Sequence, residues 1–113
     1  MAKSENKTIR VVIINPNEET ITERDIPQKD NYQVLREIVR GSIELVRFSD
    51  VDMYVNENGR YLKGASVFRY NDAKRGWTVP LIGSALLLKL HGNGGYMPCT
   101  LSLDTVRQRV EFL

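Results

Sequence analysis

The chain has little of what several classes of protein require. Cys99 is its single cysteine, so no internal disulfide and no cysteine-rich zinc site can form. The longest apolar runs, residues 11–14 and 85–88, are far shorter than the ~20 residues that a membrane-spanning helix needs. Residues 1–7 are polar and contain no apolar signal region. These absences predict a protein of a reducing cytoplasm. The polar residues 1–7 are predicted as a flexible tail, and the chain length predicts one domain over residues 8–113.

Patterns typical of catalysis or of bound cofactors are also missing. His91 is the single histidine, and neither Ser84 nor Cys99 lies in a catalytic triad or nucleophile-elbow pattern with it. The acidic and amide residues near position 50 do not follow the spacing of a calcium-binding loop, and residues 91–95 match neither phosphate-binding glycine motif. The sequence therefore predicts no enzyme, no metal and no cofactor, although residues distant in sequence can still converge in space.

Charge is distributed unequally along the chain. Residues 1–58 hold 8 Lys and Arg against 11 Asp and Glu, a net of −3, whereas residues 59–113 hold 8 against 3, a net of +5. The total of +2 is too mild for a dedicated binder of duplex DNA. The composition, 42% apolar and 27% charged, is that of an ordinary globular domain.

Strand patterns dominate the chain. Residues 8–15 are β-branched and apolar, and the turn after them leads to a more polar partner strand at 20–26, which predicts a hairpin. Residues 42–48 and 51–57 read as further strands, and Asn58-Gly59 predicts a type I′ turn that returns the chain along 60–63. Residues 64–79 show no clean period and are predicted as a loop or interrupted helix. Residues 81–90 are predicted as one buried strand with a bulge at Gly83.

Two helices complete the predicted fold. The first covers about 30–40, with Asp30 or Asn31 as its cap and Gly41 at its end. The second covers about 103–112 and is capped by Ser102. Short connections and an excess of strands favour the α+β class, with a mixed, mainly antiparallel sheet flanked by both helices. The predicted core consists of Val11, Ile13, Leu35, Ile38, Ile43, Leu45, Met53, Val55, Leu86, Leu88, Val106 and Val110.

Four short blocks of the sequence carry a family resemblance. They are residues 39–44 (VRGSIE), residues 56–59 (NENG), residues 81–83 (LIG) and residues 101–103 (LSL). Together they resemble an uncharacterised small-domain family of bacteriophages, plasmids and integrative elements, over about residues 8–113. The resemblance implies a mobile-element protein in a bacterial host cell and implies no mechanism.

The most suggestive chemistry lies where cations alternate with aromatic rings. Cations paired with rings suit a nucleotide, because phosphate meets the charge and the base stacks on the ring. The predicted ligand-binding residues are Arg60, Lys63, Arg69, Tyr70, Lys74, Arg75 and Trp77. An equally weighted interpretation is that the aromatic residues belong to the core while the cations solvate the surface.

Two functions remain open at this point. One is a non-enzymatic phage counter-defence or accessory protein that sequesters a nucleotide-derived ligand as a homo-oligomer. The other is a protein-interaction module that modulates a host protein or mimics nucleic acid.

Overall fold

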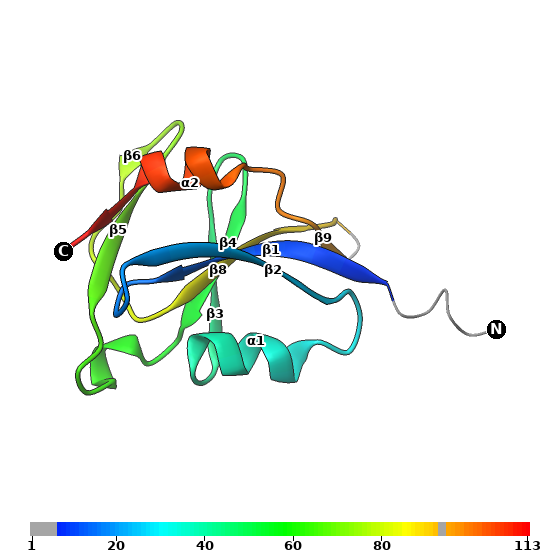
Figure 1. Ribbon diagram of the computed structural model, residues 1–113, viewed down its shortest axis with the longest axis horizontal. Coiled ribbons are helices and arrows are strands. Elements are labelled where there is room, and N and C mark those ends of the chain that lie inside the picture. Colours follow the sequence, from blue (N-terminus) through cyan, green and yellow to red (C-terminus); the bar gives the residue numbers. More distant parts are fainter. Residues whose placement is uncertain (1–6, 93–94) are drawn as a thin grey trace.

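The computed structural model describes residues 7–92 and 95–113. The predicted tail at 1–7 therefore lies outside the described residues except for Lys7. The described strands form two mainly antiparallel sheets, with two helices beside them (Figure 1). This arrangement confirms the predicted α+β class.

The larger sheet is built around its most apolar strand. Strand β8 (Ala85–Leu90) lies between β1 (Thr8–Asn15) and β4 (Asp52–Asn56) and pairs antiparallel with both. Strand β2 (Thr20–Pro27) pairs with β1 in the predicted hairpin, and β3 (Ile43–Arg47) forms the opposite edge. Strand β9 (Tyr96–Met97) pairs with the end of β8. Because β8 is covered on both faces, it tolerates a continuous apolar run.

Each face of the larger sheet covers its own apolar cluster. Helix α1 (Tyr32–Val39) packs on one face, where Leu35 and Val39 are buried with Val11, Leu86 and other strand residues. Helix α2 (Leu103–Arg109) and the smaller sheet pack on the opposite face, around a cluster that includes Val106. The molecule therefore has three layers: helix α1, the larger sheet, and a layer that combines the smaller sheet with α2 (Figure 1).

The smaller sheet contains β5 (Val67–Asp72), β6 (Gly76–Trp77), β7 (Leu81–Ile82) and β10 (Val110–Phe112). The prediction of a loop or helix at 64–79 is wrong, because residues 67–72 alternate strictly between half-buried and buried. Phe68 and Tyr70 point into the core, and Asp72 continues this inward row. Because Asp72 is polar although it points inward, the alternation of apolar and polar residues that marks a strand was incomplete in the sequence.

The predicted hairpin across Asn58-Gly59 is also wrong. Residues 59–61 form the short 3₁₀ helix η2 (Gly59–Tyr61), and β4 pairs instead with β3 and β8. The Asn56 side-chain oxygen accepts the Asn58 N–H at 2.7 Å, which closes a local turn. A Cβ on Gly59 would lie 2.9 Å from the carbonyl oxygen of Ile82, so glycine is required here by close packing and not by a type I′ turn.

Strand 81–90 is divided at Gly83, which has a φ of 88°. Residues 81–82 pair with β5 of the smaller sheet, whereas residues 85–90 belong to the larger one. The predicted bulge is therefore the point where the chain changes sheet. The predicted second helix likewise ends early, because residues 110–112 leave the helix to pair with β5.

Details of the helix ends and core also differ from prediction. Asn31 stands at the start of α1, but its side chain donates to the Pro27 carbonyl at 2.9 Å and does not cap the helix. Leu45 is exposed, because edge strand β3 presents that side chain to solvent. Ser102 does cap α2, since its hydroxyl accepts the Thr105 N–H at 3.1 Å. The remaining predicted core residues are buried or half-buried.

Candidate functional site

The predicted basic and aromatic residues occupy the β5–β6 hairpin and the η2 segment, where the structure disperses them. Arg69 forms an ion pair with Glu111 on β10, and its guanidinium lies 4.5 Å from the centre of the Trp77 ring. Arg75 lies 3.6 Å from the Asp72 carboxylate and donates to the Arg47 carbonyl at 2.9 Å. Two of the predicted phosphate-binding cations therefore already have partners within the chain.

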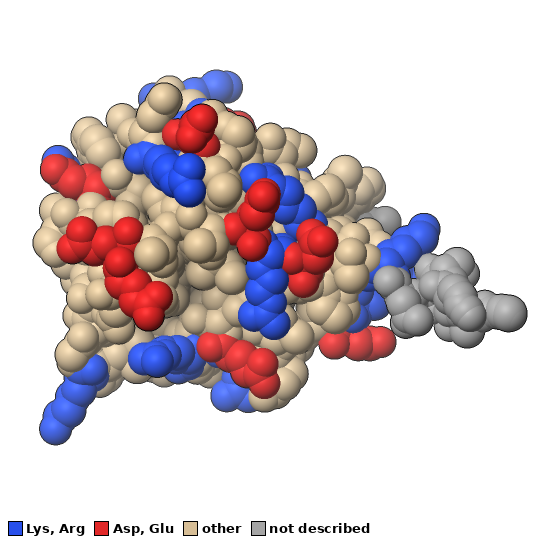
Figure 2. Space-filling model, in the orientation of Figure 1, with Lys and Arg blue, Asp and Glu red and all other residues tan. Residues whose placement is uncertain are grey.

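The other predicted site residues do not form one surface. Tyr70 is fully buried, so its ring is not accessible for stacking on a base. Arg60 and Lys63 are exposed at η2, and Lys74 is exposed at the hairpin turn. Trp77 is 43% exposed, with Arg69 already against its ring. On the face of the molecule in view in Figure 2, basic and acidic side chains are interspersed.

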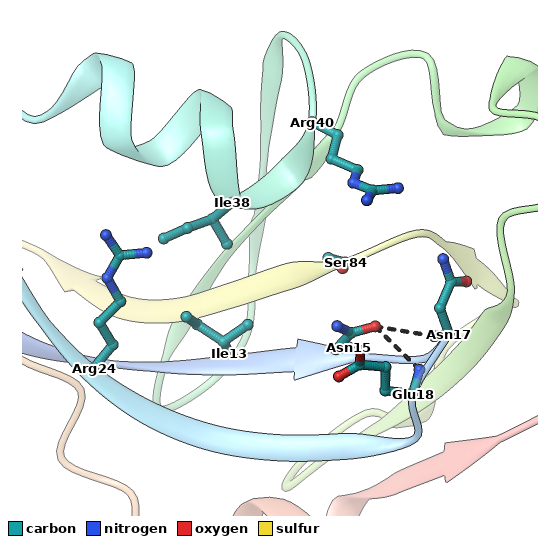
Figure 3. Close-up of a pocket in the computed structure, with 8 residues that line it drawn as sticks. All are labelled: Ile13, Asn15, Asn17, Glu18, Arg24, Ile38, Arg40 and Ser84. Atoms are coloured by element: carbon teal, nitrogen blue, oxygen red, sulfur yellow. Dashed lines mark hydrogen bonds between the residues drawn. The ribbon is translucent and has the colours of Figure 1, made fainter.

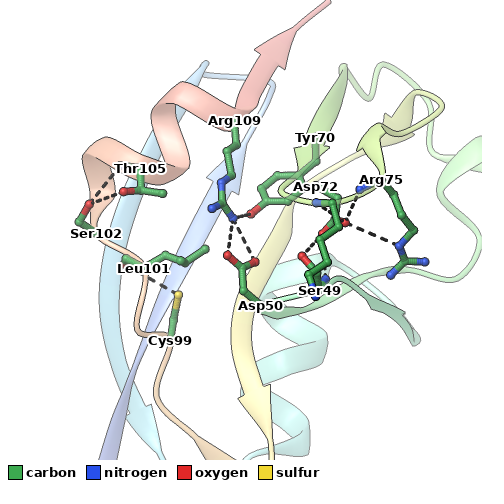
Figure 4. Close-up of polar contacts among 11 residues, drawn as sticks. Ser49, Asp50, Tyr70, Asp72, Arg75, Cys99, Leu101, Ser102, Thr105 and Arg109 are labelled. Carbon is green, nitrogen blue, oxygen red and sulfur yellow. Dashed lines mark hydrogen bonds and ion pairs between the residues drawn. The ribbon is translucent and has the colours of Figure 1, made fainter.

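Asp72 holds the hairpin by accepting hydrogen bonds. Its side chain accepts from the Ser49 N–H at 2.8 Å, the Ser49 hydroxyl at 3.0 Å and the Arg75 N–H at 2.9 Å (Figure 4). Burial raises the pKa of this carboxyl, but these bonds outweigh burial and lower the pKa to about 2. Asp72 is thus a structural anion that joins the two sheets.

A second polar cluster lies beside it. The Arg109 guanidinium lies 2.9 Å from one Asp50 oxygen and donates to the Tyr70 hydroxyl at 3.2 Å (Figure 4). Burial raises the pKa of Tyr70, and the Arg109 hydrogen bond opposes this shift. The Tyr70 hydrogen bond raises the pKa of Arg109. This cluster satisfies a buried hydroxyl and joins α2 to both sheets.

A more promising site lies on the α1 face of the larger sheet, past the C-terminal end of that helix. It is an open cleft of about 300 Å³ (Figure 3). Its lining residues come from β1, the β1–β2 turn, β2, the end of α1 and the β7–β8 connection. They are Ile13, Asn15, Asn17, Glu18, Arg24, Ile38, Arg40 and Ser84. Helix α1 has only eight residues, so it leaves this end of the sheet uncovered.

The polar lining of the cleft consists mostly of hydrogen-bond donors. No side-chain hydrogen bond or ion pair engages Arg24 or Arg40 within the described part of the chain. Asn15 already uses its side-chain oxygen to accept the N–H groups of Asn17 and Glu18, at 3.1 and 3.2 Å. The Asn17 oxygen likewise accepts the Ser66 N–H at 2.7 Å. Both side-chain NH₂ groups therefore remain available as donors, which suits an anion.

Local backbone structure places Arg40 at the cleft. Arg40 ends α1 in the left-handed conformation, with a φ of 66°. The buried Asn56 side chain donates to the carbonyls of Val39 and Arg40, at 3.0 Å each, and so stabilises this turn. A Cβ on Gly41 would lie 2.7 Å from the Asn56 amide nitrogen, so the residue after Arg40 must be glycine. These two carbonyls carry part of the negative charge at the C-terminal end of the helix, which would repel an anion. Their hydrogen bonds from Asn56 reduce that repulsion.

Ser84 reaches the cleft through the sheet register. Ile14 stands opposite Ala85 in the β1–β8 pairing, so the next pair along places Ser84 beside Asn15. Ile13 and Ile38 face one another from the sheet and the helix (Figure 3). The cleft thus combines an apolar floor with basic and amide groups around it.

Comparison with known proteins concerns nearly the whole domain. A family model described as a domain of unknown function, DUF3846, matches residues 9–110. The chain belongs to the DUF3846 family. No curated protein and no solved structure matches it.

Sequence reasoning missed the cleft of this DUF3846 domain because its lining residues span positions 13–84. Two local signals were present. The turn at residues 15–18 carries two asparagines, whose side chains commonly accept backbone N–H groups, and Arg40 directly precedes a glycine at a helix end. Neither signal indicates that the two segments meet.

Within residues 7–92 and 95–113, no group of three or more His, Cys, Asp or Glu side chains is arranged to hold a metal ion. No helix in the same residues has the length and apolar character to cross a membrane.

Proposed function

We propose that this DUF3846 domain binds a nucleotide-type anionic ligand in the cleft, without catalysing a reaction. The observation that carries this proposal is the pair of unpartnered guanidiniums, Arg24 and Arg40, at a cleft whose amide groups also present donors. Guanidinium groups bind phosphate through charge-assisted, often bidentate hydrogen bonds. Cations already paired with carboxylates, as on the β5–β6 hairpin, have less to gain from a ligand.

The size and floor of the cleft support a single nucleotide as the ligand. Its volume of about 300 Å³ lies at the lower end of the range for small-molecule sites. Ile13 and Ile38 supply an apolar surface that a planar base can cover. A long nucleic-acid strand would instead need a continuous basic groove, and the face in Figure 2 mixes charges of both signs.

The biological setting belongs to the same proposal. Sequestration of a nucleotide-derived signal is a function that a phage or mobile-element accessory protein performs in counter-defence, inside the bacterial cell. The motif blocks at residues 39–44 and 56–59 support that setting. Arg24 and Arg40 are exposed, so a second copy of the chain that covers the cleft would enclose the ligand in a homo-oligomer. Light scattering with and without ligand measures this association.

The test is calorimetric titration with nucleoside 5′-monophosphates. We expect Arg40→Asn to weaken binding at least tenfold, because one charged hydrogen bond is worth about 1.5–3 kcal/mol. Asparagine tolerates the left-handed conformation of Arg40, so the fold is retained. Arg24→Gln should also weaken binding, because it removes the second cation of the cleft, and Arg75→Gln is the matched control. A loss of binding with Arg75→Gln but not with Arg40→Asn would place the site on the hairpin and contradict the proposal.

A protein-interaction module remains the second candidate. Trp77 on β6, Val79 two residues after it and Leu113 after β10 are 43%, 75% and 56% exposed. Exposed apolar side chains are common in surfaces that bind proteins. A failure of every nucleotide to bind, together with capture of a host protein that Trp77→Ser abolishes, would favour this candidate.

A further inference from the structure

Glu18 is the exception among the polar residues of the cleft. It is the one carboxylate in a lining that otherwise offers two guanidiniums, two side-chain amides and a hydroxyl. No cation pairs with Glu18 within the described residues. A ligand that presented only negative charge here would be repelled by this carboxylate. A ligand that also brings a hydrogen-bond donor to Glu18 would offset this repulsion.

The hairpin turn holds Glu18 in place. Its backbone N–H donates to the Asn15 side-chain oxygen at 3.2 Å, and the following residue, Glu19, has a φ of 55°. Asn17 fixes the same turn to the start of β5 through the Ser66 N–H. From this turn the Glu18 side chain extends back toward Asn15 (Figure 3). The turn therefore places the exposed Glu18 side chain on the same side of the cleft as Asn15.

The other lining residues divide the cleft into two ends. Arg40, Ser84 and Asn17 lie toward one end, whereas Arg24 lies at the other (Figure 3). Ile13 and Ile38 face one another between them. The donor-rich end suits the phosphate, and the isoleucines suit the base, on which the Arg24 guanidinium can stack. The sugar then lies between phosphate and base, on the side of Asn15 and Glu18.

We infer that the cleft selects ribonucleotides over 2′-deoxyribonucleotides, with Glu18 accepting hydrogen bonds from the ribose hydroxyls. This inference rests on the proposed function of the same cleft. A carboxylate that accepts from a ribose hydroxyl contributes to affinity only when that hydroxyl is present. A site built around such a hydroxyl disfavours the analogue that lacks it, because the acceptor is desolvated without compensation.

The experiment compares adenosine and guanosine 5′-monophosphates with their 2′-deoxy counterparts by calorimetry. For the wild-type chain we expect the ribonucleotide to bind at least fivefold more tightly. Glu18→Ala should reduce this ratio to below twofold while still binding both forms, and it should bind the deoxy form no more weakly than wild type does. Glu37→Ala, an exposed helix position outside the cleft, is the matched control and should keep the wild-type ratio.

The outcomes separate this inference from the proposal on which it rests. Equal affinity of the wild-type chain for both forms, with Arg40→Asn still weakening each of them, overturns ribose selection and leaves the binding cleft intact. A preference that survives Glu18→Ala also overturns it, because the carboxylate would then not be its source. If no nucleotide binds at all, the proposed function itself fails.

Discussion

Asp72 is a buried carboxylate at the end of β5, and at the scale of single residues it illustrates how polar groups hold this molecule together. Its oxygens accept N–H groups from the Ser49 loop and from its own hairpin turn. The side chain is 2% exposed, so a lost hydrogen bond is not replaced by water. An amide in place of the carboxylate would set an NH₂ donor against backbone N–H donors.

We expect Asp72→Asn to lower the free energy of unfolding by about 2 kcal/mol at neutral pH. The pKa of Asp72 is about 2 in the folded chain, against an ordinary value of 3.8. Because the folded pKa is depressed, the stabilisation is present above about pH 4 and disappears as the pH falls toward 2. Urea unfolding between pH 7 and pH 2 measures both effects.

The matched control for Asp72 is Asp25→Asn, on the exposed part of β2. It should change stability by less than about 0.5 kcal/mol. Similar losses for the two variants, or an acid profile of Asp72→Asn identical to that of the wild type, would contradict a structural role for the buried carboxylate.

At the scale of elements, the short strand β10 closes the edge of the smaller sheet. It follows α2 directly, and Val110 and Phe112 pack against the core while Glu111 is exposed. The apolar spacing across residues 103–113 suits a helix, but the edge of β5 offers backbone hydrogen bonds that a longer helix could not make. The Leu113 N–H continues this pairing by donating to the Val67 carbonyl at 3.1 Å.

We expect Phe112→Ala to destabilise the chain by about 2 kcal/mol, because it removes a ring that packs against the core. Glu111→Ala should cost less than about 1 kcal/mol, since its ion pair with Arg69 is partly exposed. Thermal unfolding of the two variants checks this difference. Fast amide exchange at Leu113 in the wild type, or equal losses from both substitutions, would argue against a terminal strand.

At the scale of the whole molecule, a few side chains join layers that are distant in sequence. Arg109 on α2 contacts Asp50, in the loop before β4, and Tyr70 on β5. The Arg109 and Asp50 side chains are 20% and 35% exposed, so their attraction is less screened than that of a surface pair. This contact fastens α2 to both sheets.

A double-mutant cycle on Arg109→Ala and Asp50→Ala should give a coupling energy of about 1 kcal/mol. The control lies on the same helix, where Arg107 and Asp104 are 3.5 Å apart and mostly exposed. Their coupling should be below about 0.5 kcal/mol. Urea unfolding of the single and double variants measures both cycles, and equal coupling energies would contradict a special role for the Arg109 contact.

Local signals determined several parts of this DUF3846 domain from the sequence alone. The β1–β2 hairpin follows from a β-branched run and an Asn-Pro turn, and α1 follows from its stripe of Val34, Leu35, Ile38 and Val39. The Ser102 cap was equally predictable, because a capping hydroxyl acts within three residues. In each case the interactions that stabilise the element connect neighbours in the chain.

Tertiary structure decided the rest. Gly59 is needed because the Ile82 backbone lies too close to it for a side chain. Strand β10 forms because β5 offers an unpaired edge. The cleft forms because the end of α1 and the turn of the first hairpin line the same space. The basic and aromatic residues of the second half are close in sequence, yet alternation along β5 sends Tyr70 into the core and Arg69 outward. Proximity in sequence does not place side chains on one face of a strand, because successive residues point to opposite sides.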